Sequence, residues 1–148
     1  MLTEPEELAR AAAEARRTLL RVAAEALILS DRGEQVLAGV RAREHLGRLA
    51  PVSGPLVRRF FALQDALPPP GLDPEAEELR LRLDAVLRHH ALLLTLALDL
   101  LAMEWRSERL SRQLDALDGF GAPARQLEEV YAELRADPGL SEPVWPVP

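Results

Sequence analysis

Apolar and small residues recur along the first third of the chain with a spacing that alternates between three and four residues. This spacing places them on one face of an α-helix and is typical of the seam along which helices pack. Thr3 and Glu6 form a capping-box pattern, and Pro5 falls in the first turn, where proline is tolerated. The pattern predicts a helix over residues 4–49, with a bend or break near Gly33 left open. The seam consists of Leu8, Ala12, Ala15, Leu19, Val22, Ala26, Leu29, Gly33, Val36 and Val40.

Proline and glycine divide the rest of the chain into three further helices. Pro51, Gly54 and Pro55 predict a stop, because a proline inside a helix removes a hydrogen bond and clashes with the preceding turn. Asp73 followed by Pro74 is a typical helix start, and the next breakers come only at Gly119 and Gly121. The predicted helices therefore span residues 4–49, 55–67, 74–118 and 123–136.

Each of the two long predicted helices is acidic at its start and basic at its end. The first has Glu6 early and Arg41 late, and the second has Glu77 early and Arg106 late. An antiparallel arrangement sets acidic ends beside basic ends, whereas a parallel one sets like charges side by side. We therefore expect an all-α helical bundle in which the two long helices run antiparallel and two short helices complete the core.

The leucine-rich middle of the second long helix is apolar on most of its sides. One small chain cannot cover all of that surface with its own helices, so part of it is expected to contact a second copy. This predicts a homodimer whose long helices form a four-helix bundle with coiled-coil-like packing. The candidate self-association residues are Leu93, Leu94, Leu96, Leu100 and Leu101.

Composition limits the class of protein further. The 148 residues are 48% hydrophobic and 28% charged, which fits one folded domain, predicted over residues 1–139, followed by an extended Pro-rich tail at 140–148. The absence of cysteine excludes disulfides and thiolate chemistry. The net charge of −6 does not draw the protein to nucleic acid or to an anionic membrane. The acidic N-terminus resembles no signal peptide and no apolar run is long enough to span a bilayer, so a cytoplasmic protein is expected.

His89 and His90 are the first residues to consider for catalysis or metal binding. Adjacent residues on a helix point about 100° apart, so the two rings cannot serve one site together. Neither has a carboxylate or another histidine three or four positions away, which is the spacing of a helical metal site. We therefore expect no metal site and no cofactor.

Arg82 is followed by six residues and then by His89. This spacing resembles the Arg-x(4–6)-His signature of HEPN-type ribonucleases, which are all-α dimers. The resemblance covers eight residues, and Leu83 stands where the family usually has a polar residue. It implies that Arg82 would bind phosphate and that His89 would move protons to and from a ribose hydroxyl. A ribonuclease or toxin–antitoxin component is thus the enzyme alternative.

Two surfaces are candidates for binding a partner. Five arginines around the first predicted turn could bind an anion, a nucleic acid or an acidic protein, or could simply balance the acidic start of the third helix. The apolar tail could dock on its own bundle or on another protein as an extended peptide. The arginines are Arg41, Arg43, Arg48, Arg58 and Arg59, and the tail residues are Val144 and Trp145.

The sequence contains no recognisable convergent set of catalytic residues. The favoured interpretation is therefore a non-catalytic structural or interaction protein, a scaffold or adaptor that acts through protein–protein contacts. Ribonuclease activity and anion or nucleic-acid binding through the arginine cluster are the two alternatives.

Overall fold

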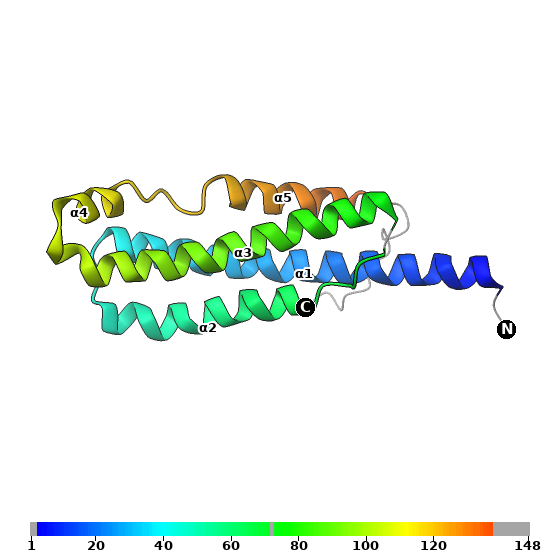
Figure 1. Ribbon diagram of the computed structural model, residues 1–148, viewed down its shortest axis with the longest axis horizontal. Coiled ribbons are helices and arrows are strands. Elements are labelled where there is room, and N and C mark those ends of the chain that lie inside the picture. The colour runs from blue at the N-terminus through cyan, green and yellow to red at the C-terminus, as the bar shows by residue number, and fades with distance from the viewer. Residues whose placement is uncertain (1–2, 72, 138–148) are drawn as a thin grey trace.

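The computed structural model describes residues 3–71 and 73–137, and all regular secondary structure within these ranges is helical. The predicted all-α helical bundle is confirmed, although several helix ends differ from the predicted ones. The elements, shown in Figure 1, are α1 (Glu4–Arg41), α2 (Leu46–Asp65), α3 (Pro74–Met103), the 3₁₀ turn η1 (Glu104–Arg106), α4 (Glu108–Asp115) and α5 (Ala122–Arg135).

The two longest helices, α1 and α3, run parallel, so the predicted antiparallel arrangement is wrong. The reason is α2, which has 20 residues and runs back toward the side of the bundle from which α1 starts. α3 therefore begins on that side and runs in the same direction as α1 (Figure 1). Contacts between α1 and α3 follow the same order along both helices. Arg16 lies 2.6 Å from Asp73, Ser30 lies 3.0 Å from His90, and Arg43 lies 2.8 Å from Glu104.

α1 ends at Arg41 rather than at residue 49, because the chain turns through a left-handed residue, Arg43, with φ of 59°. The Glu44 N–H donates to the Gly39 carbonyl (2.9 Å) and the Arg43 N–H donates to the Val40 carbonyl (3.0 Å). This is the Schellman pattern that closes helices, and glycine usually holds its left-handed position. An arginine in that position offered no sequence signal for the end of the helix.

α2 runs through both of its prolines, so the predicted stop at residues 50–55 is wrong. Its N-cap is His45, whose Nδ1 accepts a hydrogen bond from the Gly47 N–H at 3.0 Å. Pro51 and Pro55 lie on the exposed face, where carbonyls that lose a helical partner accept from water. On the opposite face, buried side chains continue across both prolines, and their packing offsets the two missing hydrogen bonds. These side chains are Leu49, Ser53, Leu56, Phe60 and Leu63.

α3 ends at Met103, well before the predicted residue 118, and the chain continues through η1 into α4. Ser107 has an extended backbone, with φ of −164° and ψ of 135°. Its hydroxyl accepts from the Arg109 N–H at 3.1 Å, so Ser107 is the N-cap of α4. Neither proline nor glycine marks this break, which is why the sequence predicts one unbroken helix. α4 folds back on the end of α3 and buries Leu114.

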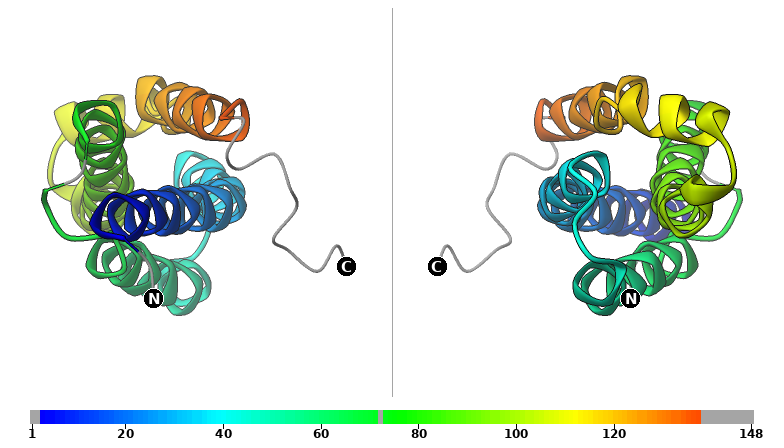
Figure 2. Two further views of the ribbon diagram at one scale, coloured as in Figure 1. Left: turned by 90° about the vertical axis from the view of Figure 1, so that its right-hand side faces the viewer. Right: turned by 90° about the vertical axis from the view of Figure 1, so that its left-hand side faces the viewer.

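α5 completes the bundle and lies within one residue of the helix predicted at 123–136. It packs on α1 and α3 on the side opposite α2, as the end-on views in Figure 2 show. α1 passes unbroken through Gly33, where the Phe120 ring packs so closely that a Cβ would lie 2.5 Å from Cζ. The buried core between these helices includes Leu19, Leu37, Val40, Phe60, Leu83, Val86, Leu87, Leu94, Leu127 and Leu134.

α3 is also the most apolar helix of the described chain. With η1 it forms the one segment there, Pro74–Arg106, that is long and apolar enough to cross a membrane by length and composition. The core helix of a folded bundle meets the same criteria, and α3 does contact α1, α2 and α5. Only 33% of its most apolar stretch is buried, so α3 presents apolar surface outward as well as inward. The expectation that the chain has no membrane span stays a prediction.

Candidate functional site

The structure does not gather the five predicted partner-binding arginines into one site. Arg43 is held in the turn after α1 by an ion pair with Glu104. Arg59 borders a groove between α1 and α2, whereas Arg41 borders a separate hollow beside Leu117 and Gly119. Arg41, Arg48 and Arg58 are exposed at the end of α1, in the first turn of α2 and in the second half of α2. The tail candidates Val144 and Trp145 lie outside the described residues.

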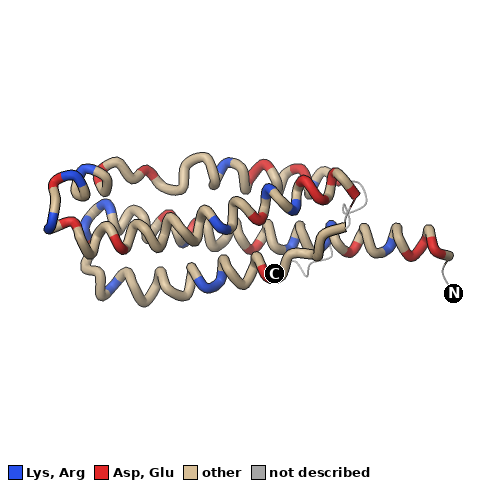
Figure 3. Tube along the Cα trace, in the orientation of Figure 1, with Lys and Arg blue, Asp and Glu red and all other residues tan. Residues whose placement is uncertain are grey.

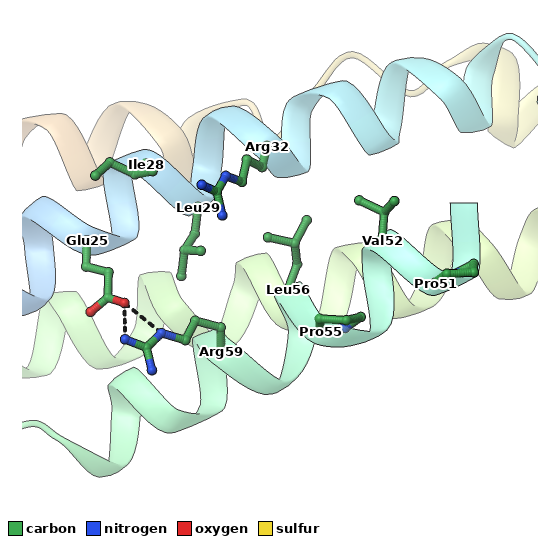
Figure 4. A pocket seen from close by; sticks show the side chains of 9 residues that line it. All are labelled: Glu25, Ile28, Leu29, Arg32, Pro51, Val52, Pro55, Leu56 and Arg59. Atoms are coloured by element: carbon green, nitrogen blue, oxygen red, sulfur yellow. Dashed lines mark hydrogen bonds and ion pairs between the residues drawn. The ribbon is translucent and has the colours of Figure 1, made fainter. Parts of the chain in front are cut away.

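A surface groove of about 570 Å³ lies between α1 and α2 (Figure 4). Leu29 and Leu56 form its buried floor, whereas Ile28 and Val52 stand at its edges with 58% and 52% of their surface exposed. Large apolar side chains exposed together in a concave surface are characteristic of binding sites. The lining residues are Glu25, Ile28, Leu29, Arg32, Pro51, Val52, Pro55, Leu56 and Arg59.

The walls of this groove come from helix positions that lie outside the core seam. Ile28 and Arg32 are one turn apart on α1, and Pro51 and Pro55 are one turn apart on α2. The two proline rings make the α2 wall largely apolar, while the Gly47 and Pro51 carbonyls, which lose their helical donors, remain as acceptors on this face. The groove can therefore recognise an occupant mainly through apolar contact and through the charged groups at its edges.

Two arginines give the groove its charge. Arg59 donates from Nε to Glu25 Oε1 at 2.6 Å, and a second nitrogen of Arg59 donates to the same oxygen, so this guanidinium is already paired (Figure 4). The Arg32 side chain has no hydrogen bond or ion pair with any residue in the described ranges 3–71 and 73–137. A carboxylate on an occupant would find a guanidinium with free donors at Arg32.

Arg82 and His89, the residues of the ribonuclease hypothesis, do not form a common site within the described chain. Arg82 is paired with α5, at 2.7 Å from Glu133 and 3.8 Å from Glu129. His89 is exposed two turns further along α3, and neither residue lines the groove between α1 and α2. The geometry of one chain gives this hypothesis no support, and ribonuclease activity stays an untested prediction.

His90 lies in the core, fully buried beside the rings of Phe60 and Phe120, whose centroids are 5.1 and 4.1 Å away. Its Nδ1 is 2.8 Å from the Val86 carbonyl, which can only accept, so Nδ1 carries the proton. Nε2 therefore accepts from the Ser30 hydroxyl at 3.0 Å. Burial lowers the pKa of His90 from its usual value of 6.5, so the ring is neutral and ties α3 to α1.

The neutral state of His90 predicts a loss of stability in mild acid. The unfolded chain takes up a proton at this histidine near pH 6.5, whereas the folded chain resists protonation until a lower pH. The free energy of unfolding should therefore fall as the pH drops below about 6.5, by at most about 1.4 kcal/mol per pH unit. Urea unfolding at pH 7.5 and 5.5 measures this. His90→Gln, which cannot titrate, should remove most of the difference, and an equal pH dependence in both proteins would contradict the assignment.

The predicted self-association leucines mostly belong to the core of the chain itself. Leu94 is fully buried, and Leu93, Leu100 and Leu101 are partly buried against the same cluster. Leu96 alone among the five is exposed, at 52%. The sequence predicted surplus apolar surface on this helix but could not say which of its leucines face outward.

No three His, Asp or Glu side chains in the described part of the chain cluster as metal ligands would. No buried side-chain nitrogen or oxygen in that part lacks a hydrogen-bond partner either. The fold and the groove together define an all-α helical bundle with an apolar, arginine-edged surface groove. Comparisons with protein-family models, curated proteins and solved structures find no match for the chain.

Proposed function

We propose that this protein is a non-catalytic interaction protein that binds an acidic amphipathic helix of a partner protein in the groove between α1 and α2. The groove itself carries the proposal, since its floor is apolar and its edges expose Ile28 and Val52 to solvent. Such a surface suits a protein partner better than a small polar substrate.

The shape of the groove favours a helix as the occupant. Its walls are two neighbouring helices, and a third helix packs into such a groove through side chains at positions i, i+3, i+4 and i+7. On α1 the groove extends from Glu25 to Arg32, which is about 10 Å of helix and matches two turns of a bound helix. On α2, the rings of Pro51 and Pro55 give the opposite wall an apolar surface for such side chains.

Charge favours an acidic occupant. The Glu25 carboxylate is already held by Arg59, so the group left to select the partner is Arg32. A basic helix would place its cations beside this guanidinium, and like charges at close range are unfavourable. A glutamate at the edge of an apolar helix face would instead form a charge-assisted hydrogen bond with Arg32.

A designed peptide pair tests this proposal. Both peptides are labelled amphipathic helices with leucines at i, i+3, i+4 and i+7, and they differ only in having glutamates or lysines beside the leucines. Fluorescence polarisation should show that the glutamate peptide binds the wild-type protein more tightly. Arg32→Glu should weaken its binding about tenfold and should favour the lysine peptide instead.

Arg41→Glu is the matched control, because it makes the same charge change on the same helix at an exposed position outside the groove. It should leave both affinities nearly unchanged. Equal binding of the two peptides, or equal effects of the two substitutions, would show that the groove does not select an acidic helix.

A further inference from the structure

A second apolar surface runs along α3, on the side that no helix of the described chain covers. Four large side chains there are 43–54% exposed and share one helix face, within an arc of about 60°. They lie opposite fully buried residues such as Leu83, Leu87 and Leu94. An exposed strip of this kind on the most apolar helix indicates a missing partner. We call it the α3 strip, and it consists of Leu81, Leu92, Leu96 and Met103.

The neighbour α1 balances the acidic start of α3 only in part, through Arg16, which lies 2.6 Å from Asp73 and 4.0 Å from Glu75. The helix starts with Glu75, Glu77 and Glu78, and the chain leaves it through η1 with Arg106. Because α1 runs parallel to α3, both helices end at the same end of the bundle, where Figure 3 shows blue and red segments together. Arg43 pairs there with Glu104 and Asp115, so these two acids already have a basic partner within the chain. A partner helix of opposite direction would complement this polarity.

Two further charges lie within the α3 strip and differ in how they are satisfied. Arg88 is paired only with Asp84, at 3.3 Å on its own helix, and 58% of the Arg88 side chain is exposed. The Asp99 side chain has no hydrogen bond or ion pair with the rest of the described chain, although it sits between Leu96 and Met103. Its exposed carboxylate is therefore available to a group from another molecule.

A second copy of α3 satisfies both features at once. When two α3 helices pack antiparallel about a two-fold axis between Leu92 and Leu96, position 88 of one copy lies opposite position 99 of the other. Arg88 then meets Asp99, and Leu81 lies within about a turn of Met103 across the interface. The same arrangement sets the acidic start of each α3 beside the basic end of the other.

We infer that the protein forms a symmetric homodimer in which the α3 strips of two copies pack antiparallel and Arg88 of each copy pairs with Asp99 of the other. This goes beyond the proposed function, because the α3 strip and the groove between α1 and α2 are separate surfaces. A dimer built in this way leaves both grooves open. Arg88 and Asp99 also argue against a lipid as the occupant of the strip, since both charges would face hydrocarbon.

Sedimentation equilibrium from about 1 to about 100 µM tests the dimer. The wild-type protein should show twice the chain mass of 16.4 kDa. Leu92→Ser combined with Leu96→Ser should raise the dimer dissociation constant at least about tenfold, because it removes the centre of the strip. Ile28→Ser, which changes an equally exposed apolar residue on α1, is the control and should leave the dissociation constant unchanged. Circular dichroism checks that each variant keeps its helix content.

A charge exchange tests the antiparallel register. Arg88→Glu and Asp99→Arg should each weaken the dimer about fivefold, and the double variant should restore it, because the two-fold axis then pairs the exchanged charges again. A monomer throughout the concentration range overturns the dimer, and sedimentation of that monomer with anionic vesicles assigns the strip to lipid. A stable dimer in which the double variant is no better than either single variant overturns the antiparallel arrangement.

Discussion

Replacing His90 with alanine should lower the free energy of unfolding by about 3 kcal/mol. The imidazole is fully buried between α1 and α3, next to the rings of Phe60 and Phe120. Its removal leaves a cavity in the core, and it also takes away the acceptor for the Ser30 hydroxyl, which is itself buried. Chemical denaturation monitored by circular dichroism near pH 7.5 measures the change.

His89→Ala is the matched control, because it removes the same side chain at the neighbouring position, where the ring is exposed. That variant should change the free energy of unfolding by less than about 0.5 kcal/mol. If the two alanine variants were equally stable, the position of His90 in the core would be wrong. The comparison thus separates a structural histidine from a surface one with a single pair of substitutions.

Arg43 should be the residue outside the core whose loss destabilises the bundle most. Its guanidinium lies 2.8 Å from Glu104 and 2.9 Å from Asp115, and it donates to the Ser111 carbonyl at 2.9 Å. These contacts join the turn after α1 to η1 and α4. Arg43→Ala should therefore lower the free energy of unfolding by about 2 kcal/mol.

Arg43→Gly loses the same contacts but relieves the left-handed backbone, whose φ is 59°. Glycine adopts this conformation with little strain, so this variant should be about 1 kcal/mol more stable than Arg43→Ala. Arg41→Ala, at an exposed position two residues earlier, is the control for loss of a positive charge. A glycine variant no more stable than the alanine variant would show that the backbone at position 43 is not strained.

Capping residues in the sequence correctly predicted where α1 and α3 begin, because a helix start depends on contacts between neighbouring residues. The capping box of Thr3 and Glu6 is present at the start of α1, and the Asp73 cap begins α3. The helix ends were missed where tertiary contacts replace the usual signal. Arg43 holds a position normally given to glycine, and Ser107 starts α4 with no proline or glycine before it. Charge and spacing alone could not reveal either break.

The direction of the long helices was predicted wrongly because the charge argument assumed that they begin level with each other. In the structure α3 begins beside Arg16, so its acidic start does not meet the acidic start of α1. Arg16 instead contacts Asp73 at 2.6 Å and Asp137 at 2.5 Å. The position at which α3 begins along α1 depends on the length of α2, which connects them. Because the sequence predicted a stop at residues 50–55, the length of α2 was underestimated.

The groove could be predicted only in part. Arg59 belonged to the predicted arginine cluster, but Ile28 and Arg32 lie beside the seam of α1 and carry no sequence signal of their own. Pro51 and Pro55 suggested a turn, whereas the folded chain uses them as a groove wall. Side chains from two distant segments meet there, and such a meeting follows from tertiary packing rather than from spacing along the chain.

Amide chemical shifts of the ¹⁵N-labelled protein, recorded while the glutamate peptide is added, test the central claim most directly. Binding of an acidic helix between α1 and α2 predicts shift changes centred on residues 25–32 and 51–59. Changes centred instead on α3, around Arg82 and His89, or no changes at all, would contradict the proposed function.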